Sequence, residues 1–154
     1  MVDPLFDKLP DENKFDELTF EALNDVLEKI KEDAQEGYNS CCIFDDVGAS
    51  LKDKDIQKLL KQMIFNRRHY HLNCYFLIQS WKSCPLPIRK LFSNCFIFKV
   101  SKKEMDTILD DVLEIPKQYV EPIMKQVYDK PHKWLFFNVT SGRLFDGFNE
   151  IILE

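Results

Sequence analysis

Apolar residues recur at two different spacings along this chain, and each spacing predicts a different kind of element. Over residues 15–37, apolar side chains return at intervals of three and four, which is typical of an amphipathic helix, and residues 55–69 repeat the pattern. A short helix is expected over residues 88–92. Ser101, with Glu104 three positions later, forms a capping box and predicts the start of a further helix. Another helix is expected from about Pro116.

The strands are predicted from runs without helical spacing. Three continuous apolar runs are typical of strands buried on both faces of a sheet: residues 41–44, 73–78 and 95–100. Residues 133–139 and 143–148 flank a short turn with a glycine, which predicts a C-terminal β-hairpin. Helices that alternate with strands favour an α/β fold with a mainly parallel sheet flanked by helices.

The composition fits one compact domain. The chain has 154 residues and a hydrophobic content of 45%, so we expect a single domain over residues 1–154, with an irregular lead-in at residues 1–14. The acidic N-terminus is not typical of a signal peptide, and no apolar run is long enough to span a membrane. Five cysteines without a CxxC spacing indicate reduced, buried thiols in an intracellular protein.

The charge is distributed unevenly. The chain has a net charge of −5, yet residues 61–103 contain lysine and arginine but no carboxylate. Such a segment suits contact with phosphate, either of a nucleotide or of a nucleic acid. A basic face that packs against the acidic N-terminal part explains the composition equally well.

The first predicted strand ends in two adjacent carboxylates, Asp45 and Asp46, within the sequence CCIFDDVG. An apolar strand ending in Asp-Asp is the Walker B pattern of P-loop NTPases, in which the first carboxylate holds Mg²⁺ and the second activates the attacking water. Many buried strands also end in Asp because a turn or a helix cap follows. Gln79 closes the next strand, where an amide can reach a γ-phosphate or simply end the strand. Because carboxyl ends of parallel strands meet at one edge, the three side chains are expected together.

Two arginines, Arg67 and Arg68, precede that second strand. An arginine near a subunit edge can act as a trans-acting finger on the nucleotide of a neighbouring subunit. Cations at a helix end also interact favourably with the helix dipole, so both interpretations stay open.

The motifs stand in a definite order: IFDDV, a predicted helix, RRH, YFLIQS, PIRK and FIFKVSKKEMDTILDD. This ordered set resembles the FtsK–HerA superfamily of DNA-pumping ATPases, and it is most similar to the genome-packaging ATPases of large eukaryotic DNA viruses, the poxvirus-like branch. The similarity covers about residues 15–148. It implies a RecA/FtsK-like P-loop core, incomplete here, that uses ATP and Mg²⁺ to pump double-stranded DNA into a capsid as a hexameric ring.

The resemblance also implies residue roles. Asp45 would be the Walker B metal ligand and Asp46 the catalytic carboxylate. Gln79 would act as the sensor of the nucleotide, and Arg68 is the better of the two finger candidates. Arg89, in the Ile-Arg position, would bind phosphate or a neighbouring subunit. A location in the host cytoplasm or the virion, with capsid or virion proteins as partners, follows from the same resemblance.

One element of that family does not occur in this sequence. The phosphate-binding loop GxxxxGK[ST] has no match, because Lys82-Ser83 lacks glycine at both required positions before it. The chain therefore resembles the distal part of the ATPase domain and is not expected to hydrolyse ATP well by itself. The alternative hypothesis is a non-catalytic structural or interaction subunit that kept the fold and lost nucleotide binding.

Overall fold

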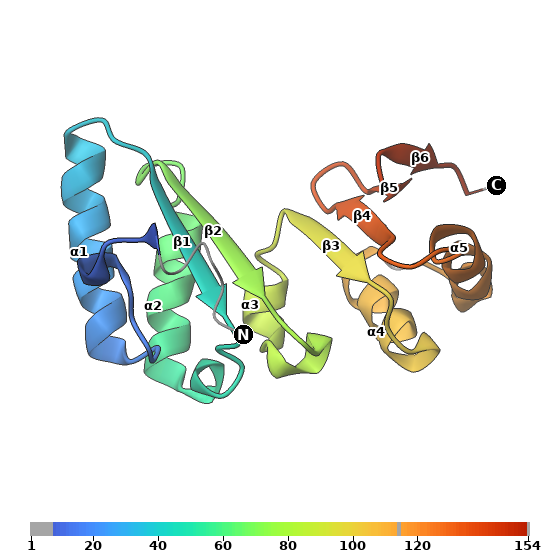
Figure 1. Ribbon diagram of the computed structural model, residues 1–154, viewed down its shortest axis with the longest axis horizontal. Coiled ribbons are helices and arrows are strands. Elements are labelled where there is room, and N and C mark those ends of the chain that lie inside the picture. The colour runs from blue at the N-terminus through green and yellow to red at the C-terminus, as the bar shows by residue number, and fades with distance from the viewer. Residues whose placement is uncertain (1–7, 114, 154) are drawn as a thin grey trace. The chain divides into compact units, whose positions relative to one another are not determined.

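The computed structural model describes residues 8–113 and 115–153 of the chain, as Figure 1 shows. The chain divides into two compact units, Met1–Ile88 and Arg89–Glu154, and each is described here by itself. Both units combine helices with a small sheet, so the predicted mixed α/β class is confirmed, whereas the predicted extent of the parallel sheet is not.

The N-terminal unit is built around a two-stranded parallel sheet. Strand β1 (Ser40–Asp45) pairs with β2 (Leu72–Leu77) over their full lengths, and α2 (Lys54–Phe65) connects them. Helix α1 (Phe20–Gln35) precedes β1, and the short helix α3 (Leu86–Arg89) follows β2. Single 3-10 turns occur at Asp11–Asn13, Ser50–Lys52 and Trp81–Ser83.

Helix α1 begins five residues later than the apolar spacing predicted. Thr19 caps it, because the Thr19 hydroxyl oxygen accepts a hydrogen bond from the Ala22 N–H at 3.1 Å. Leu23, Leu27 and Ile30 form its buried face. The helix ends at Gln35, and Gly37 follows with a φ of 85°, the left-handed conformation that commonly terminates helices.

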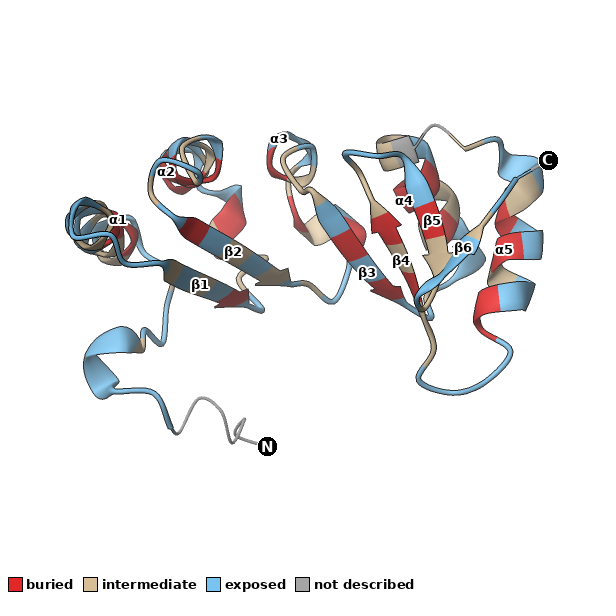
Figure 2. Cartoon of the chain, turned by 90° about the horizontal axis from the view of Figure 1, so that it is seen from above, coloured by how far each residue is buried: buried red, intermediate tan, exposed pale blue. Residues whose placement is uncertain are grey.

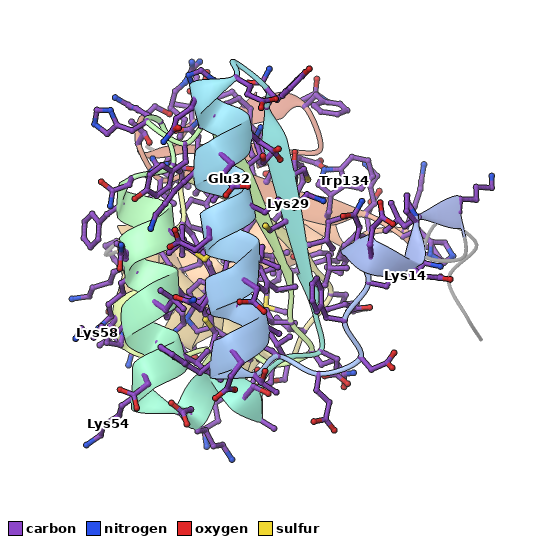
Figure 3. All side chains as sticks on the ribbon, turned by 90° about the vertical axis from the view of Figure 1, so that its left-hand side faces the viewer. Lys14, Lys29, Glu32, Lys54, Lys58 and Trp134 are labelled. Atoms are coloured by element: carbon purple, nitrogen blue, oxygen red, sulfur yellow. The ribbon has the colours of Figure 1, made fainter. Side chains whose placement is uncertain are left out.

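Helix α2 begins after a side-chain cap at Asp53. The Asp53 carboxylate accepts hydrogen bonds from the N–H groups of Asp55 at 2.7 Å and Ile56 at 3.1 Å. Its buried face has the predicted helical spacing: Ile56, Leu59, Leu60, Met63 and Ile64. Figure 3 shows Lys54 and Lys58 extending away from the helix on its outer side. Because α2 follows β1 and precedes β2, its capped end follows the carboxyl end of β1 in the chain.

Burial on both faces was predicted for β1 and β2, and this prediction is wrong for the described residues. Along β1 and β2 the side chains alternate in exposure, and Ile43, Tyr75 and Leu77 are each more than half exposed. Their register pairs, Ile43 with Tyr75 and Asp45 with Leu77, place them on one face. The strands are apolar on both faces, but α1 and α2 cover only the opposite one.

The C-terminal unit contains a four-stranded antiparallel sheet. Its strands run in the order β3 (Asn94–Phe98), β4 (Trp134–Asn138), β5 (Arg143–Asp146) and β6 (Asn149–Ile151). Helices α4 (Lys102–Leu113) and α5 (Val120–Val127) connect β3 to β4, with a 3-10 turn at Lys117–Tyr119 before α5. The predicted hairpin is confirmed as β4 and β5, and β6 extends it. Ser101 caps α4 as predicted, through a 3.3 Å bond from the Glu104 N–H to the Ser101 hydroxyl.

Strand β3 was expected to be a third parallel strand, and the structure corrects this. It pairs antiparallel with β4, from Asn94 opposite Asn138 to Phe98 opposite Trp134. A single crossover helix returns a chain to the starting end of a strand, which makes the next strand parallel. Here two helices intervene, so the chain enters β4 from the other end.

The core of the C-terminal unit lies between the sheet and its two helices. The covered sheet face consists of Cys95, Ile97, Leu135, Phe137 and Leu144, all buried. The helices contribute Met105, Ile108, Leu109, Val120, Ile123 and Val127. Figure 2 shows the result as buried bands that alternate with exposed ones along the strands. Tyr128 joins the two layers, because its hydroxyl donates to the Ile97 carbonyl at 2.8 Å.

Candidate functional site

The two carboxylates singled out by sequence lie at the carboxyl end of the parallel pair. Asp45 is the last residue of β1 and is opposite Leu77, the last residue of β2. Asp46 follows, and its N–H donates to the Leu77 carbonyl at 3.3 Å, which extends the pairing by one bond. Both carboxylates are exposed. The strand register therefore fixes Asp45 and Asp46 at one defined edge of the sheet.

Asp46 has an unusual backbone conformation. The backbone angle φ of Asp46 is 50°, in the left-handed region, which residues other than Gly, Asn and Asp rarely adopt. This conformation costs on the order of 1 kcal/mol and turns the chain sharply out of the sheet. As a result, the regular alternation of side chains along β1 ends at Asp45.

The loop after β1 packs against the turn after β2. A Cβ atom placed on Gly48 would lie 3.1 Å from Cβ and 3.3 Å from the hydroxyl oxygen of Ser83. Ser83 is held in turn by its own hydroxyl, which donates to the Ser80 carbonyl at 2.6 Å. The sequence analysis did not foresee this contact, although Gly48 is the one glycine beside the Asp-Asp pair.

Gln79 lies in the bend that begins two residues beyond β2, and its side chain is exposed. The Gly48–Ser83 contact holds this bend against the loop that carries Asp46. The structure thus brings the backbone positions of Asp45, Asp46 and Gln79 to the same edge of the sheet, as parallel pairing required.

Arg68 lies at the other end of the sheet. It is exposed within the turn between α2 and β2, and its carbonyl accepts a hydrogen bond from the His71 N–H at 3.4 Å. The His71 carbonyl in turn accepts from the Ser40 N–H at 3.0 Å, at the start of β1. A six-residue strand is about 20 Å long, so Arg68 is separated from the carboxylates of its own chain. Arg67 is engaged locally, since its guanidinium donates to the Ile64 carbonyl at 3.0 Å.

Arg89 is the last residue of α3 and the first residue of the C-terminal unit, and it forms an ion pair with Asp111 of α4. The distance from Arg89 Nη1 to Asp111 Oδ2 is 2.5 Å, and both side chains are mostly buried. This pairing occupies the guanidinium that the resemblance reserves for phosphate or a neighbouring subunit. A phosphate at Arg89 would have to compete with the Asp111 carboxylate.

The carboxylates of Asp45 and Asp46 are the part of this site whose chemistry suits Mg²⁺. Exposed carboxylate oxygens are the ligands that Mg²⁺ uses, and it commonly takes only one or two of them beside water and phosphate oxygens. No group of three His, Cys, Asp or Glu side chains suited to a metal occurs among the described residues. Asp45 therefore fits a Mg²⁺ ligand only together with phosphate. The glycine of this loop is used for packing on Ser83, so the described loop offers no glycine-rich cradle for phosphate.

The cysteines of the parallel sheet lie beside one another. Cys42 of β1 is in register with Cys74 of β2, and burial raises the pKa of Cys42 to about 11 and that of Cys74 to about 12. All five cysteines are free thiols; Cys84 and Cys95 are buried, whereas Cys41 is exposed. The prediction of buried thiols is therefore wrong for Cys41, which lies on the uncovered sheet face.

Comparison with known proteins identifies no family for this chain. No protein-family model, curated protein or solved structure matches it significantly. None of the helices in the described part of the chain is long and apolar enough to cross a membrane. The function is therefore argued from the residues themselves.

Proposed function

We propose that this chain carries the Walker B and sensor part of an ATP-driven double-stranded DNA translocase of the FtsK–HerA type, used to package a viral genome. The observation that carries the proposal is the parallel, in-register pairing of β1 and β2. This pairing brings the loops of Asp45, Asp46 and Gln79 to one edge, where the Gly48–Ser83 contact holds them together. Asp45 would bind Mg²⁺, Asp46 would activate water, and Gln79 would contact the γ-phosphate or that water.

Another polypeptide segment would have to supply the phosphate-binding loop. The sequence of this chain contains no GxxxxGK[ST], and backbone N–H groups of such a loop are what hold the phosphates. The position of Arg68, about one strand length from Asp45, fits a finger that acts on a neighbouring subunit. A homo-oligomer, hexameric by resemblance, supplies that neighbour. The proposed setting is the host cytoplasm or the virion, beside capsid proteins.

DNA would be held through its backbone, since a pump must be indifferent to sequence. Several basic side chains of residues 61–103 are exposed: Arg68, Lys82, Lys90, Lys99, Lys102 and Lys103. Lys102 pairs with Glu121 at 3.0 Å, which leaves it less available than the others to bind phosphate. Exposure supports the proposal over the alternative use of this segment for internal packing.

One experiment tests the assignment directly. The chain is mixed with a P-loop-bearing segment encoded upstream or beside it, and ATP hydrolysis is measured with Mg²⁺ and double-stranded DNA. We expect DNA-stimulated turnover that Asp46→Asn abolishes, while Asp129→Asn, an exposed carboxylate on the C-terminal unit, leaves it unchanged. Turnover that survives Asp46→Asn would refute the catalytic role of Asp46. Robust turnover by this chain alone would refute the assignment of phosphate binding to another segment.

A second candidate function rests on the same missing loop. A non-catalytic subunit that keeps the fold would bind neither Mg²⁺–ATP nor its analogues, with or without a P-loop-bearing partner. In that case the partner's turnover would be insensitive to Asp45→Asn and Asp46→Asn alike. Nucleotide binding that depends on Asp45 in the mixture separates the two functions.

A further inference from the structure

The C-terminal sheet has a second face that neither α4 nor α5, the helices of its own unit, covers. Six aromatic side chains gather there, from β3, β4, β5 and the turn before β6: Phe96, Phe98, Trp134, Phe136, Phe145 and Phe148. We call this set the aromatic face. Phe96 is 59% exposed, Phe98 62% and Phe148 83%. Large apolar side chains left in water to this extent, and in one patch, mark an interaction site.

The aromatic side chains form continuous rows across the strands. Phe96 stacks on Phe136 with ring centroids 4.8 Å apart, and Phe136 contacts Phe145 at 5.3 Å. In the next row, Phe98 is opposite Trp134, and Phe148 meets the Trp134 ring edge-on at 6.0 Å. The six rings therefore form one continuous apolar patch across β3, β4, β5 and the turn before β6.

The charges on this face do not suit a nucleic acid. Among the described strand positions of this face, the cation is Arg143. The Arg143 guanidinium donates hydrogen bonds to Glu150 on β6, through Nε at 2.5 Å and also through Nη2. The same guanidinium lies 5.5 Å from the Phe145 ring. A surface that binds a nucleic-acid backbone needs available cations. Arg143 is already paired with Glu150, so the described strand positions of the aromatic face offer no available cation.

The area of the face is also small for a symmetric dimer. The three most exposed phenyl groups present on the order of 400 Å². A stable interface needs about 800 Å² from each partner. A narrower occupant that lies along one of the rows fits this area better than a second copy of the sheet.

The same sheet shows what covers a face of this size and character. Its opposite face has five apolar residues of the same strands, and α4 and α5 bury them completely or nearly so. The five-residue strands β3 and β4 are about 17 Å long, which equals the length of a helix of about 12 residues. Helix α4 has 12 residues.

We propose that the aromatic face of the C-terminal sheet binds an amphipathic α-helix of a partner polypeptide. The helix would lay apolar residues at positions i, i+3, i+4 and i+7 on the Phe96–Phe136–Phe145 row. Its margins would be polar with both charge signs, because the rim of the face carries the paired charges of Arg143 and Glu150. This proposal does not depend on the nucleotide site of the other unit.

The test uses the full chain and a labelled, designed amphipathic helical peptide with a leucine stripe and mixed lysine and glutamate elsewhere. We expect saturable binding by fluorescence anisotropy and a change in Trp134 emission. Phe96→Ser with Phe148→Ser should weaken binding about tenfold or more. The matched control is Phe65→Ser, which removes a 68% exposed phenyl group from the other unit and should leave binding unchanged.

Single variants and two further measurements keep the outcome decisive. Phe148 lies in a turn, so Phe148→Ser alone should preserve the circular dichroism spectrum of the protein while still weakening peptide binding. Equal binding by the wild type, the double variant and the Phe65→Ser control would overturn the proposal. A dimer that sedimentation detects and that Phe96→Ser abolishes would also overturn the proposal. Binding of single-stranded DNA that Phe96→Ser weakens would overturn it as well.

Discussion

Gly48 and Ser83 approach so closely that a single added methyl group at Gly48 would lie 3.1 Å from the Ser83 Cβ atom. Ser83 cannot easily withdraw, because its hydroxyl and its N–H both bond to the Ser80 carbonyl, at 2.6 and 3.0 Å. We predict that Gly48→Ala lowers the free energy of unfolding by about 1–2 kcal/mol. Urea denaturation followed by circular dichroism measures this change.

The matched experiment is the double variant Gly48→Ala with Ser83→Gly. Removing the Ser83 side chain makes room for the new methyl group, so the two changes should be non-additive, with part of the loss recovered. Strictly additive effects would show that the two loops do not touch in solution.

A second prediction concerns the cysteine thiols. Because burial raises the pKa of Cys42 to about 11 and that of Cys74 to about 12, their reactive thiolate forms are rare at mildly alkaline pH. Iodoacetamide should modify exposed Cys41 well before either of them, and peptide mass spectrometry resolves the order. In denaturing urea the thiols of Cys41, Cys42 and Cys74 should react at similar rates. Unequal rates in urea would show that the difference in reactivity comes from the neighbouring residues in the sequence and not from the fold.

A third prediction concerns acid stability of the C-terminal unit. Hydrogen bonds from Arg143 lower the pKa of Glu150 below its ordinary value of 4.5, and those from Lys102 and Lys125 lower the pKa of Glu121. A folded-state pKa below the unfolded one contributes stability that is present above about pH 4.5 and lost as pH falls through the folded value. The urea midpoint should therefore fall on acidification in this window.

Glu150→Gln isolates this effect. Its urea midpoint should fall less on acidification than that of the wild type, because one of the protonating groups is gone. Asp129→Asn serves as the control and should follow the wild type. If Glu150→Gln and the wild type lose stability in parallel, the Arg143–Glu150 pair is not formed in solution.

A fourth prediction concerns the Arg89–Asp111 ion pair. Because both side chains are mostly buried, Arg89→Ala leaves the Asp111 carboxylate without this partner and should lower the free energy of unfolding by about 2 kcal/mol. Lys90→Ala, next in sequence and exposed, should be nearly neutral. A neutral Arg89→Ala would free this arginine for the phosphate role that the resemblance implies.

The sequence predicted the features that depend on local spacing. The buried face of α2, the Ser101 cap and the hairpin of β4 and β5 all follow from neighbours within a few residues. The direction of β3 does not, because its apolar run Cys95–Val100 suits a parallel or an antiparallel partner equally. Strand β6, Asn149–Ile151, has too few apolar residues to be predicted from the sequence.

The candidate site was predictable to the same degree. Parallel pairing made the shared edge of Asp45 and Gln79 foreseeable, and the structure has that pairing. The left-handed backbone of Asp46 and the pairing of Arg89 with Asp111 depend on loops and on residues distant in sequence. Periodicity carries no information about either.

The two-stranded sheet has one more consequence, for handling the protein. With only β1 and β2 hydrogen-bonded to each other among the described residues, each strand is also an edge, and each leaves a row of N–H and C=O groups without a ladder partner. Such edges recruit one another between molecules, and the exposed Ile43 and Tyr75 beside them add apolar attraction. Concentrated solutions of the isolated chain should therefore lose protein by aggregation, at a rate that rises with concentration, before the helices melt.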